Sequence, residues 1–215
     1  MTLKEIKTNR LFQVIYPIVV YFLVYQVGVS FLIQIFGARI GKVTCLLIAG
    51  LVCIIPIYVL YKRYPKLIPE DNLDRKTLFS YVIWVVGVVA FSIVLNILLT
   101  HSSLINSSEG FKSASATLTD GSIFIKLLCS GIVIPILEEL LIRGIVVGQL
   151  YLWIGRWPAI VISSICFGIL HNNIVQFIYA IAIGFVLSIM YTKHKRLSLC
   201  IIAHGLINII VILFS

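Results

Sequence analysis

The chain has 215 residues, of which 60% are hydrophobic and 12% are charged. Soluble domains carry about 25% charged residues, so this composition excludes an ordinary soluble domain. The net charge of +9 does not call for a nucleic-acid partner, because Lys and Arg accumulate in the cytoplasmic connections of membrane proteins. The apolar runs do not alternate with polar residues as the strands of a membrane barrel do. We therefore predict an all-α, polytopic bundle of transmembrane helices.

Long apolar runs predict about seven helices. The runs cover residues 11–37, 43–61, 78–99, 123–150, 158–171, 174–191 and 198–214. The first run is too long for the core of a signal peptide and lacks a small-residue cleavage site, so we expect a retained span. Pro135 lies inside the fourth run, where we expect a kink. The fifth run is short for a complete span.

Two polar segments separate the first runs from the rest. Residues 62–76 contain two prolines and five basic side chains. Residues 101–121 are rich in Ser, Thr and Gly and have no apolar period, so we expect a mobile loop. We therefore divide the chain into N-terminal helices and loops at 1–121 and a four-helix core at 122–215.

The basic residues are distributed unequally over the two sets of connections. With seven spans, one side of the membrane receives twelve of them: Lys4, Lys7, Arg10, Lys62, Arg63, Lys66, Arg75, Lys76, Arg156, Lys193, Lys195 and Arg196. The other side receives four: Arg39, Lys42, Lys112 and Lys126. This bias predicts a multi-pass protein of the cell membrane with its N-terminus in the cytoplasm.

The five cysteines all lie in apolar runs: Cys45, Cys53, Cys129, Cys166 and Cys200. Their odd number and the absence of a C-x-x-C spacing favour small buried side chains over disulfides or metal ligands.

Two adjacent glutamates distinguish the fourth apolar run. The other six acidic residues lie in segments predicted as connections or chain end: Glu5, Glu70, Asp71, Asp74, Glu109 and Asp120. An ionisable side chain at bilayer depth costs about 2.5–3.5 kcal/mol on insertion scales, so Glu138 and Glu139 require a purpose. Arg143 follows Glu139 by four residues and shares its helix face, which predicts an ion pair. Glu138 lies about 100° away around the helix and has no obvious local partner.

Two later helices carry further polar side chains. His171 ends the fifth run, and His204 and Asn208 share one face of the last run. With Glu138 they supply the parts that amide hydrolysis needs. The carboxylate suits a general base and later acid, and a histidine beside it would hold a water. His204 and the Asn208 amide would donate hydrogen bonds to an oxyanion.

Each of these residues also has a structural alternative. Lone polar side chains in membrane helices often bridge helices, as Asn208 or either histidine would, and the Glu139–Arg143 pair is structural even within an enzyme. Three ionisable groups on three helices are costly unless they converge. By contrast, His101 and His194 lie in polar connections, where we expect exposure to solvent.

The three motifs, in their order along apolar helices, resemble those of the CAAX-protease and bacteriocin-processing family, also called Abi proteins. The pattern is Glu-Glu-x-x-x-Arg, Phe-x-x-x-His and His-x-x-x-Asn. In this chain it corresponds to Glu138-Glu139 with Arg143, Phe167 with His171, and His204 with Asn208. The resemblance covers about residues 135–210 and implies an intramembrane endopeptidase whose catalytic core is the four-helix segment.

The resemblance also implies roles for these residues. Glu138 and His171 would activate water, and His204 and Asn208 would bind the oxyanion. The supporting residues would be Glu139, Arg143 and Phe167. We favour a mechanism without a metal cofactor; zinc is the alternative, because Glu and His are zinc ligands, although the H-E-x-x-H spacing is absent.

The implied partners are the lipid bilayer and a peptide or membrane-protein substrate, not nucleic acid. Family members include prenyl-protein proteases, processors of bacteriocin or signalling peptides, self-immunity proteins and scaffolds. The small, basic, Ile- and Lys-rich chain is more typical of bacteria, which favours a secreted or membrane-bound peptide. Two other function classes are open: a non-catalytic immunity or partner-binding protein, and a proton-coupled transporter. The absence of repeats and of paired broken helices counts against the transporter.

Overall fold

The computed structural model describes residues 9–70, 72–102, 108–119, 121–171 and 173–214. Five charged residues that the sequence analysis placed in connections or at the chain end lie outside these ranges: Lys4, Glu5, Lys7, Asp71 and Asp120.

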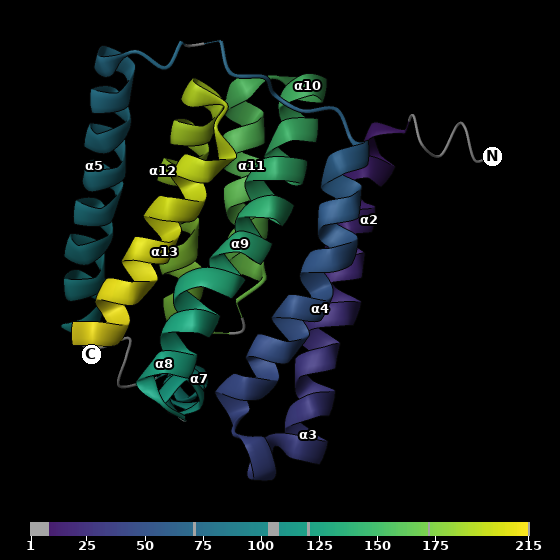
Figure 1. Ribbon diagram of the computed structural model, residues 1–215, viewed down its shortest axis with the longest axis vertical. Coiled ribbons are helices and arrows are strands. Elements are labelled where there is room, and N and C mark those ends of the chain that lie inside the picture. The colour runs from purple at the N-terminus through teal and green to yellow at the C-terminus, as the bar shows by residue number, and fades with distance from the viewer. Residues whose placement is uncertain (1–8, 71, 103–107, 120, 172, 215) are drawn as a thin grey trace.

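Most of the described residues are helical and none of them forms a strand, which confirms the predicted all-α class (Figure 1). The first half of the bundle consists of α2 (Arg10–Tyr21), η1 (Phe22–Val27), α3 (Gly28–Ile40), α4 (Lys42–Arg63), α5 (Arg75–Thr100) and α7 (Glu109–Thr119). A second continuous run follows as α8 (Ile123–Lys126), η2 (Leu127–Val133), α9 (Ile134–Glu139), η3 (Leu140–Val147) and α10 (Gly148–Ile154). The remaining helices are α11 (Arg156–Ile169), α12 (Ile174–His194) and α13 (Leu197–Phe214).

Every predicted helix is present, with ends displaced by a few residues. Five helices of the described chain are long and apolar enough to cross a membrane: 10–40, 42–63, 75–100, 174–194 and 197–214. The chain is therefore a multi-pass membrane protein. In such a bundle each helix satisfies its own backbone hydrogen bonds, which the hydrocarbon core requires.

Polar side chains fix where several helices begin. Asn9, Asp74, Ser122 and Asn173 each precede a helix and accept a hydrogen bond from a backbone N–H of its first turn. These residue types are the preferred N-caps because their side chains satisfy one of the unpaired amides there. These capping residues therefore locate the starts of the helices more precisely than the limits of the apolar runs do.

The prediction of a loop over residues 101–121 is wrong for its second half. Glu109–Thr119 forms α7. Ser108 caps it, accepting a hydrogen bond from Phe111 N at 3.2 Å, and Lys112 pairs with Glu109 at 2.9 Å. A cap and a pair three residues apart stabilise a polar surface helix without an apolar period.

The prediction that His194 is exposed is also wrong. His194 is the last residue of α12 and is 7% exposed. Its ring lies edge-on to Tyr81 at 5.0 Å and to Trp84 at 5.9 Å between centroids. Both aromatic residues lie on α5. The packing of α5 against α12 therefore buries His194, which the sequence places in a polar connection. His101, by contrast, is exposed as predicted.

The cysteines have the environment predicted for them. All five are free, four of them are buried, and Cys166 is half-buried. Cys53 and Cys200 pack in the two apolar cores of the bundle. The first of these cores joins residues of the N-terminal helices, such as Tyr21, to Leu137 and Leu141 beside the glutamates.

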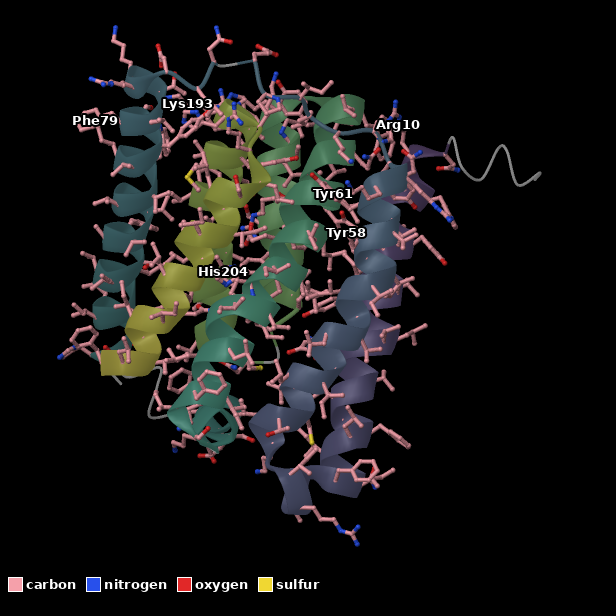
Figure 2. The ribbon with its side chains drawn as sticks, viewed as in Figure 1. Arg10, Tyr58, Tyr61, Phe79, Lys193 and His204 are labelled. Atoms are coloured by element: carbon pink, nitrogen blue, oxygen red, sulfur yellow. The ribbon has the colours of Figure 1, made fainter. Side chains whose placement is uncertain are left out.

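The basic connections gather at one end of the bundle. The start of α2, the connection from α4 to α5, and the turns before α11 and α13 all lie at the top of Figure 1, and the C-terminus lies at the bottom. Arg10 and Lys193, labelled in Figure 2, are both at this end. An ion pair between Lys195 and Glu70 joins two of these connections. The described basic residues of these connections therefore lie at the same end of the bundle, and the orientation of that end in the membrane stays a prediction.

The fifth helix is too short to cross the membrane alone. α11 has 14 residues, which span about 21 Å, whereas the hydrocarbon core is about 30 Å thick. It pairs with α12 as an antiparallel hairpin (Figure 1). A Cβ on Gly168 would lie 2.6 Å from Ile181 Cγ1, and one on Gly184 would lie 3.2 Å from Phe167 Cδ1. Small residues therefore let the two helices approach closely, and the short α11 ends at Ile169, two residues before His171.

Candidate active site

Glu139 and Arg143 form a fully buried ion pair. Arg143 Nη1 donates to Glu139 Oε1 at 2.8 Å, and neither residue is exposed to solvent. The four-residue spacing brings both side chains to one helix face, and the structure contains the predicted pair. Glu139 is the last residue of α9, and Arg143 lies in the π-helix η3 that follows it. π-Helical turns occur frequently at functional sites.

Arg143 also ties the glutamate-bearing run to the α11–α12 hairpin. Its Nη2 donates to the carbonyl oxygen of Gly184 at 3.1 Å. Its Cζ lies 4.6 Å from the centroid of the Phe167 ring. A planar guanidinium makes such forked and stacked contacts simultaneously, which an ammonium group does not. The buried charge is thereby compensated by a carboxylate, a carbonyl dipole and an aromatic face.

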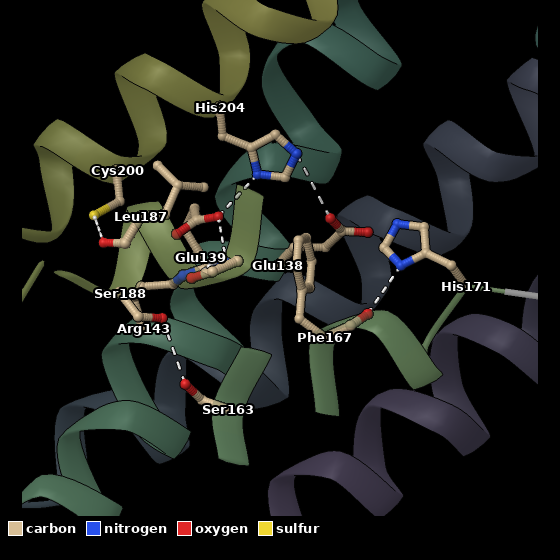
Figure 3. A network of polar contacts seen from close by, with 11 residues as sticks. Glu138, Glu139, Arg143, Ser163, Phe167, His171, Leu187, Ser188, Cys200 and His204 are labelled. Carbon is tan, nitrogen blue, oxygen red and sulfur yellow. Dashed lines mark hydrogen bonds and ion pairs between the residues drawn. The ribbon is translucent and has the colours of Figure 1, made fainter. Parts of the chain in front are cut away.

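His204 of α13 lies between the two glutamates. Its Nδ1 lies 2.8 Å from Glu139 Oε1, and its Nε2 lies 3.8 Å from Glu138 Oε2. Because Glu139 is paired with Arg143 as a carboxylate, Nδ1 is the donor in the shorter contact. Figure 3 shows the ring bridging the two acidic side chains. Glu139 therefore orients the imidazole, and the opposite nitrogen faces Glu138.

His171, just beyond α11, has a defined tautomer. Its Nδ1 lies 2.9 Å from the carbonyl oxygen of Phe167. Since a carbonyl only accepts, Nδ1 carries a proton, and Nε2 is the ring nitrogen left to contact another group. In the view of Figure 3 the Glu138 carboxylate lies between the rings of His171 and His204.

Phe167 is the common wall of the site. The His171 ring is edge-on to it with centroids 5.1 Å apart, and the His204 ring is edge-on at 6.0 Å. The aromatic ring thus contacts both imidazoles and the Arg143 guanidinium. Three separate stretches of chain converge here: the glutamate-bearing run, the end of α11, and α13.

Asn208 makes its hydrogen bond away from this cluster. Its Nδ2 donates to the carbonyl oxygen of Ser130 at 2.8 Å. This is a bridge between α13 and η2, the structural alternative that the sequence left open. An amide nitrogen carries two hydrogens, so one remains for another acceptor. The oxyanion role of Asn208 stays a prediction.

The N-terminal helices supply groups that the sequence analysis did not select. Gln26 Nε2 donates to the carbonyl oxygen of Leu170 at 3.1 Å, next to His171. Tyr21 and Tyr25 are buried and pack in the same apolar core as Leu137, the neighbour of Glu138. A polar residue inside the first apolar run and two tyrosines at helical spacing were the available signals.

An apolar groove adjoins the His171 end of the site. Its volume is about 310 Å³, and it lies between the first helix and the end of α11. It is lined by Ile18, Val19, Phe22, Leu23, Gln26, Ile169 and Leu170. The Gln26 amide is the polar group in an otherwise hydrocarbon lining.

The donors do not fit the zinc site that was the alternative. In the described part of the chain, no group of three or more His, Cys, Asp or Glu side chains is arranged to hold a metal ion. Glu139 Oε1 and His204 Nδ1 face each other, and Glu139 Oε1 also accepts from Arg143. We therefore derive no step through a metal.

Comparisons with known proteins show which family the second half of the chain is similar to. Residues 120–210 match the family model described as Type II CAAX prenyl endopeptidase Rce1-like. The match confirms the resemblance that the three motifs indicated, because it contains all of them. No solved structure matches the chain.

Two curated proteins are similar to parts of the chain. "Putative membrane peptidase YdiL" of Bacillus subtilis is 36% identical over 89 residues, which are 41% of this chain and 36% of that protein. "UPF0177 protein YxdF" of Lactococcus lactis is 26% identical over 143 residues, 64% of this chain and 77% of that protein. The chain therefore matches little more than a third of YdiL.

Proposed function

We propose, on the premise that residues 120–210 belong to the Rce1-like family of type II CAAX prenyl endopeptidases, that the chain is an intramembrane endopeptidase. The observation that carries the proposal is the convergence of Glu138, His171 and His204 around Phe167. Three ionisable groups brought together inside a membrane bundle are costly and mark a function. The neighbouring Glu139–Arg143 pair is fully buried and holds one of them in place.

The reaction is the hydrolysis of a peptide bond by an activated water. Glu138 accepts a proton from the water while Nε2 of His171 accepts a hydrogen bond from it. The water oxygen forms a bond to the carbonyl carbon, and the carbonyl oxygen takes the negative charge. The C–N bond then breaks, and the proton on Glu138 passes to the amine nitrogen. The products are a carboxyl group and an amine.

Side chains of α13 stabilise the oxyanion. His204 Nε2 and the second N–H of Asn208 are the donors, and preorganised donors of this kind act where charge develops. Donation from Nε2 requires a proton on both ring nitrogens, because Nδ1–H is bound to Glu139. Glu139, Arg143 and Phe167 act indirectly, by holding His204 in place.

The substrate is a membrane-associated or secreted peptide that approaches from the bilayer. The apolar groove of about 310 Å³ reaches Leu170, the neighbour of His171, and so offers an apolar stretch of substrate a place beside the water. The basic end of the bundle, which includes Arg10 and Lys193, faces the cytoplasm. The N-terminus is then cytoplasmic.

The test compares new peptide ends in membranes that contain variants of the chain. Membranes are prepared from cells expressing the unchanged chain, Glu138→Gln, or Glu109→Gln as a control on an exposed carboxylate of α7. We expect a set of cleaved membrane peptides with the unchanged chain and the control that is absent with Glu138→Gln. Equal cleavage with Glu138→Gln would refute the assignment, and no cleavage by any version would favour a partner-binding protein.

A further inference from the structure

Pro135 leaves a gap in the hydrogen bonding of the helix that carries the glutamates. Just before it, the backbone follows a π-type pattern, in which the N–H of Ile134 donates to the carbonyl oxygen of Cys129, five residues earlier. The next bond in this pattern would run from residue 135 to the carbonyl of Ser130. Proline has no N–H, so that bond does not form.

The last helix supplies what the proline lacks. Asn208 Nδ2 donates to the carbonyl oxygen of Ser130 at 2.8 Å. The carbonyl of Gly131, which an N–H at position 135 would meet in an ordinary α-helix, also faces α13. A Cβ on Gly205 would lie 2.7 Å from that oxygen, so a glycine is needed for this approach. One face of α13 therefore approaches the carbonyls of both Ser130 and Gly131.

These contacts lie beside the catalytic contacts of the same two segments. Asn208 and Gly205 follow His204 by four residues and one residue, and Pro135 precedes Glu138 by three. A hydrogen bond from a side chain to a backbone carbonyl in a membrane interior is directional and fixes both the depth and the rotation of the helix that donates it. Such a bond sets where His204 meets Glu139.

We propose that Asn208 is a positioning residue that replaces the missing N–H of Pro135 and docks α13 onto the broken helix. This role is additional to any contact of Asn208 with a substrate. The effect on activity rests on the proposed peptidase function, whereas the effect on folding does not. The two are therefore separable by experiment.

The test is a double-mutant cycle on the full chain purified in detergent, read by the midpoint of thermal unfolding. Asn208→Leu keeps the size of the side chain and removes the donor, and we expect the midpoint to fall by several degrees. Pro135→Ala restores a backbone N–H at the gap, so in combination it recovers at least half of that loss. If Pro135→Ala does not give folded protein, Pro135→Leu serves in its place.

Pro56→Ala is the matched control, because Pro56 also lies inside a helix, α4, whereas the hydrogen bond of Asn208 runs to Ser130 of η2. We expect the effect of Pro56→Ala on the unfolding midpoint to add to that of Asn208→Leu, with no recovery of the lost stability. Two outcomes overturn the proposal. One is that the effects of Pro135→Ala and Asn208→Leu on the midpoint are also additive, and the other is that Asn208→Leu leaves the midpoint unchanged.

Cleavage of a peptide found in the membrane comparison gives the second readout. We expect kcat to fall about tenfold or more in Asn208→Leu and to recover several-fold when Pro135→Ala is added. An Asn208 that acts only on the oxyanion gives no recovery. If no version cleaves any peptide, the peptidase proposal fails while the unfolding cycle still decides the positioning role.

Discussion

His204 Nδ1 and Glu139 Oε1 lie 2.8 Å apart, and the same oxygen accepts from Arg143 at 2.8 Å. One carboxylate oxygen therefore joins α13 to the glutamate-bearing run. Within the described part of the chain, the other oxygen of Glu139 has no hydrogen-bond partner. Glu139 is thus committed to holding His204 and Arg143. Glu138 has a longer ionic contact, 3.8 Å from its Oε2 to His204 Nε2, which is consistent with the catalytic role that we propose for it.

Glu139→Gln should be far more destabilising than Glu138→Gln. The first removes the charge that compensates the fully buried Arg143, and breaking a buried pair costs about 3–5 kcal/mol. The second should cost less than about 1 kcal/mol, because no buried cation depends on Glu138 alone. Unfolding of the purified variants in detergent measures both. Equal losses would show that the two glutamates share the structural role.

Arg143→Lys should not be a conservative change. Lysine keeps the charge beside Glu139 but loses either the bond to Gly184 O or the stacking on Phe167. We expect a loss of about 1–3 kcal/mol in the free energy of unfolding. Arg143→Met, which leaves Glu139 without a cation, should cost more. A Lys variant as stable as the unchanged chain would mean that charge alone matters.

Leu23→Trp should obstruct the groove beside His171. Leu23 lines the groove, and a larger ring there occupies the space proposed for an apolar part of the substrate. We expect KM to rise several-fold with kcat nearly unchanged, because the substitution does not touch the groups that we propose for catalysis. Phe31→Trp is the control, since Phe31 is exposed on α3. A similar KM in both variants would place the substrate elsewhere.

Asp74 should make stability depend on acid pH. Its carboxylate caps α5 by accepting from Thr77 N at 2.8 Å, and this hydrogen bond lowers the pKa of Asp74 below its ordinary value. Because the folded-state pKa is the lower one, the stabilisation is complete above the ordinary pKa of an aspartate. It is lost as the pH falls through the folded pKa. Asp74→Asn keeps a cap, so the difference in unfolding midpoint between it and the unchanged chain should narrow below about pH 4.

Cysteine labelling should establish the orientation. Ile68 is exposed in the connection between α4 and α5, and Glu109 is exposed on α7. On intact cells a membrane-impermeant maleimide should label Glu109→Cys and leave Ile68→Cys unlabelled until the cells are opened. The unchanged chain reports the background of its five native cysteines. The reverse pattern would put the N-terminus outside.

The motifs and the helices were accessible from sequence for local reasons. Seven apolar runs gave the helices because a membrane helix satisfies its backbone internally, and the Glu139–Arg143 pair followed from spacing within one helix. The helix α7 was missed because its stability comes from a cap and a pair rather than from an apolar stripe. His194 was missed because the helix that covers it, α5, is distant in sequence.

The sequence by itself determined which residues share a helix face, since that depends only on the 3.6-residue repeat. It did not determine that His204 would bind Glu139 through Nδ1, or that Asn208 would donate to Ser130. Those pairings depend on the depth and rotation of one helix against another. Only the packing of the bundle decided them, through the close approach of Gly205 to Gly131, the proline gap beside it, and the short α11 that ends next to His171.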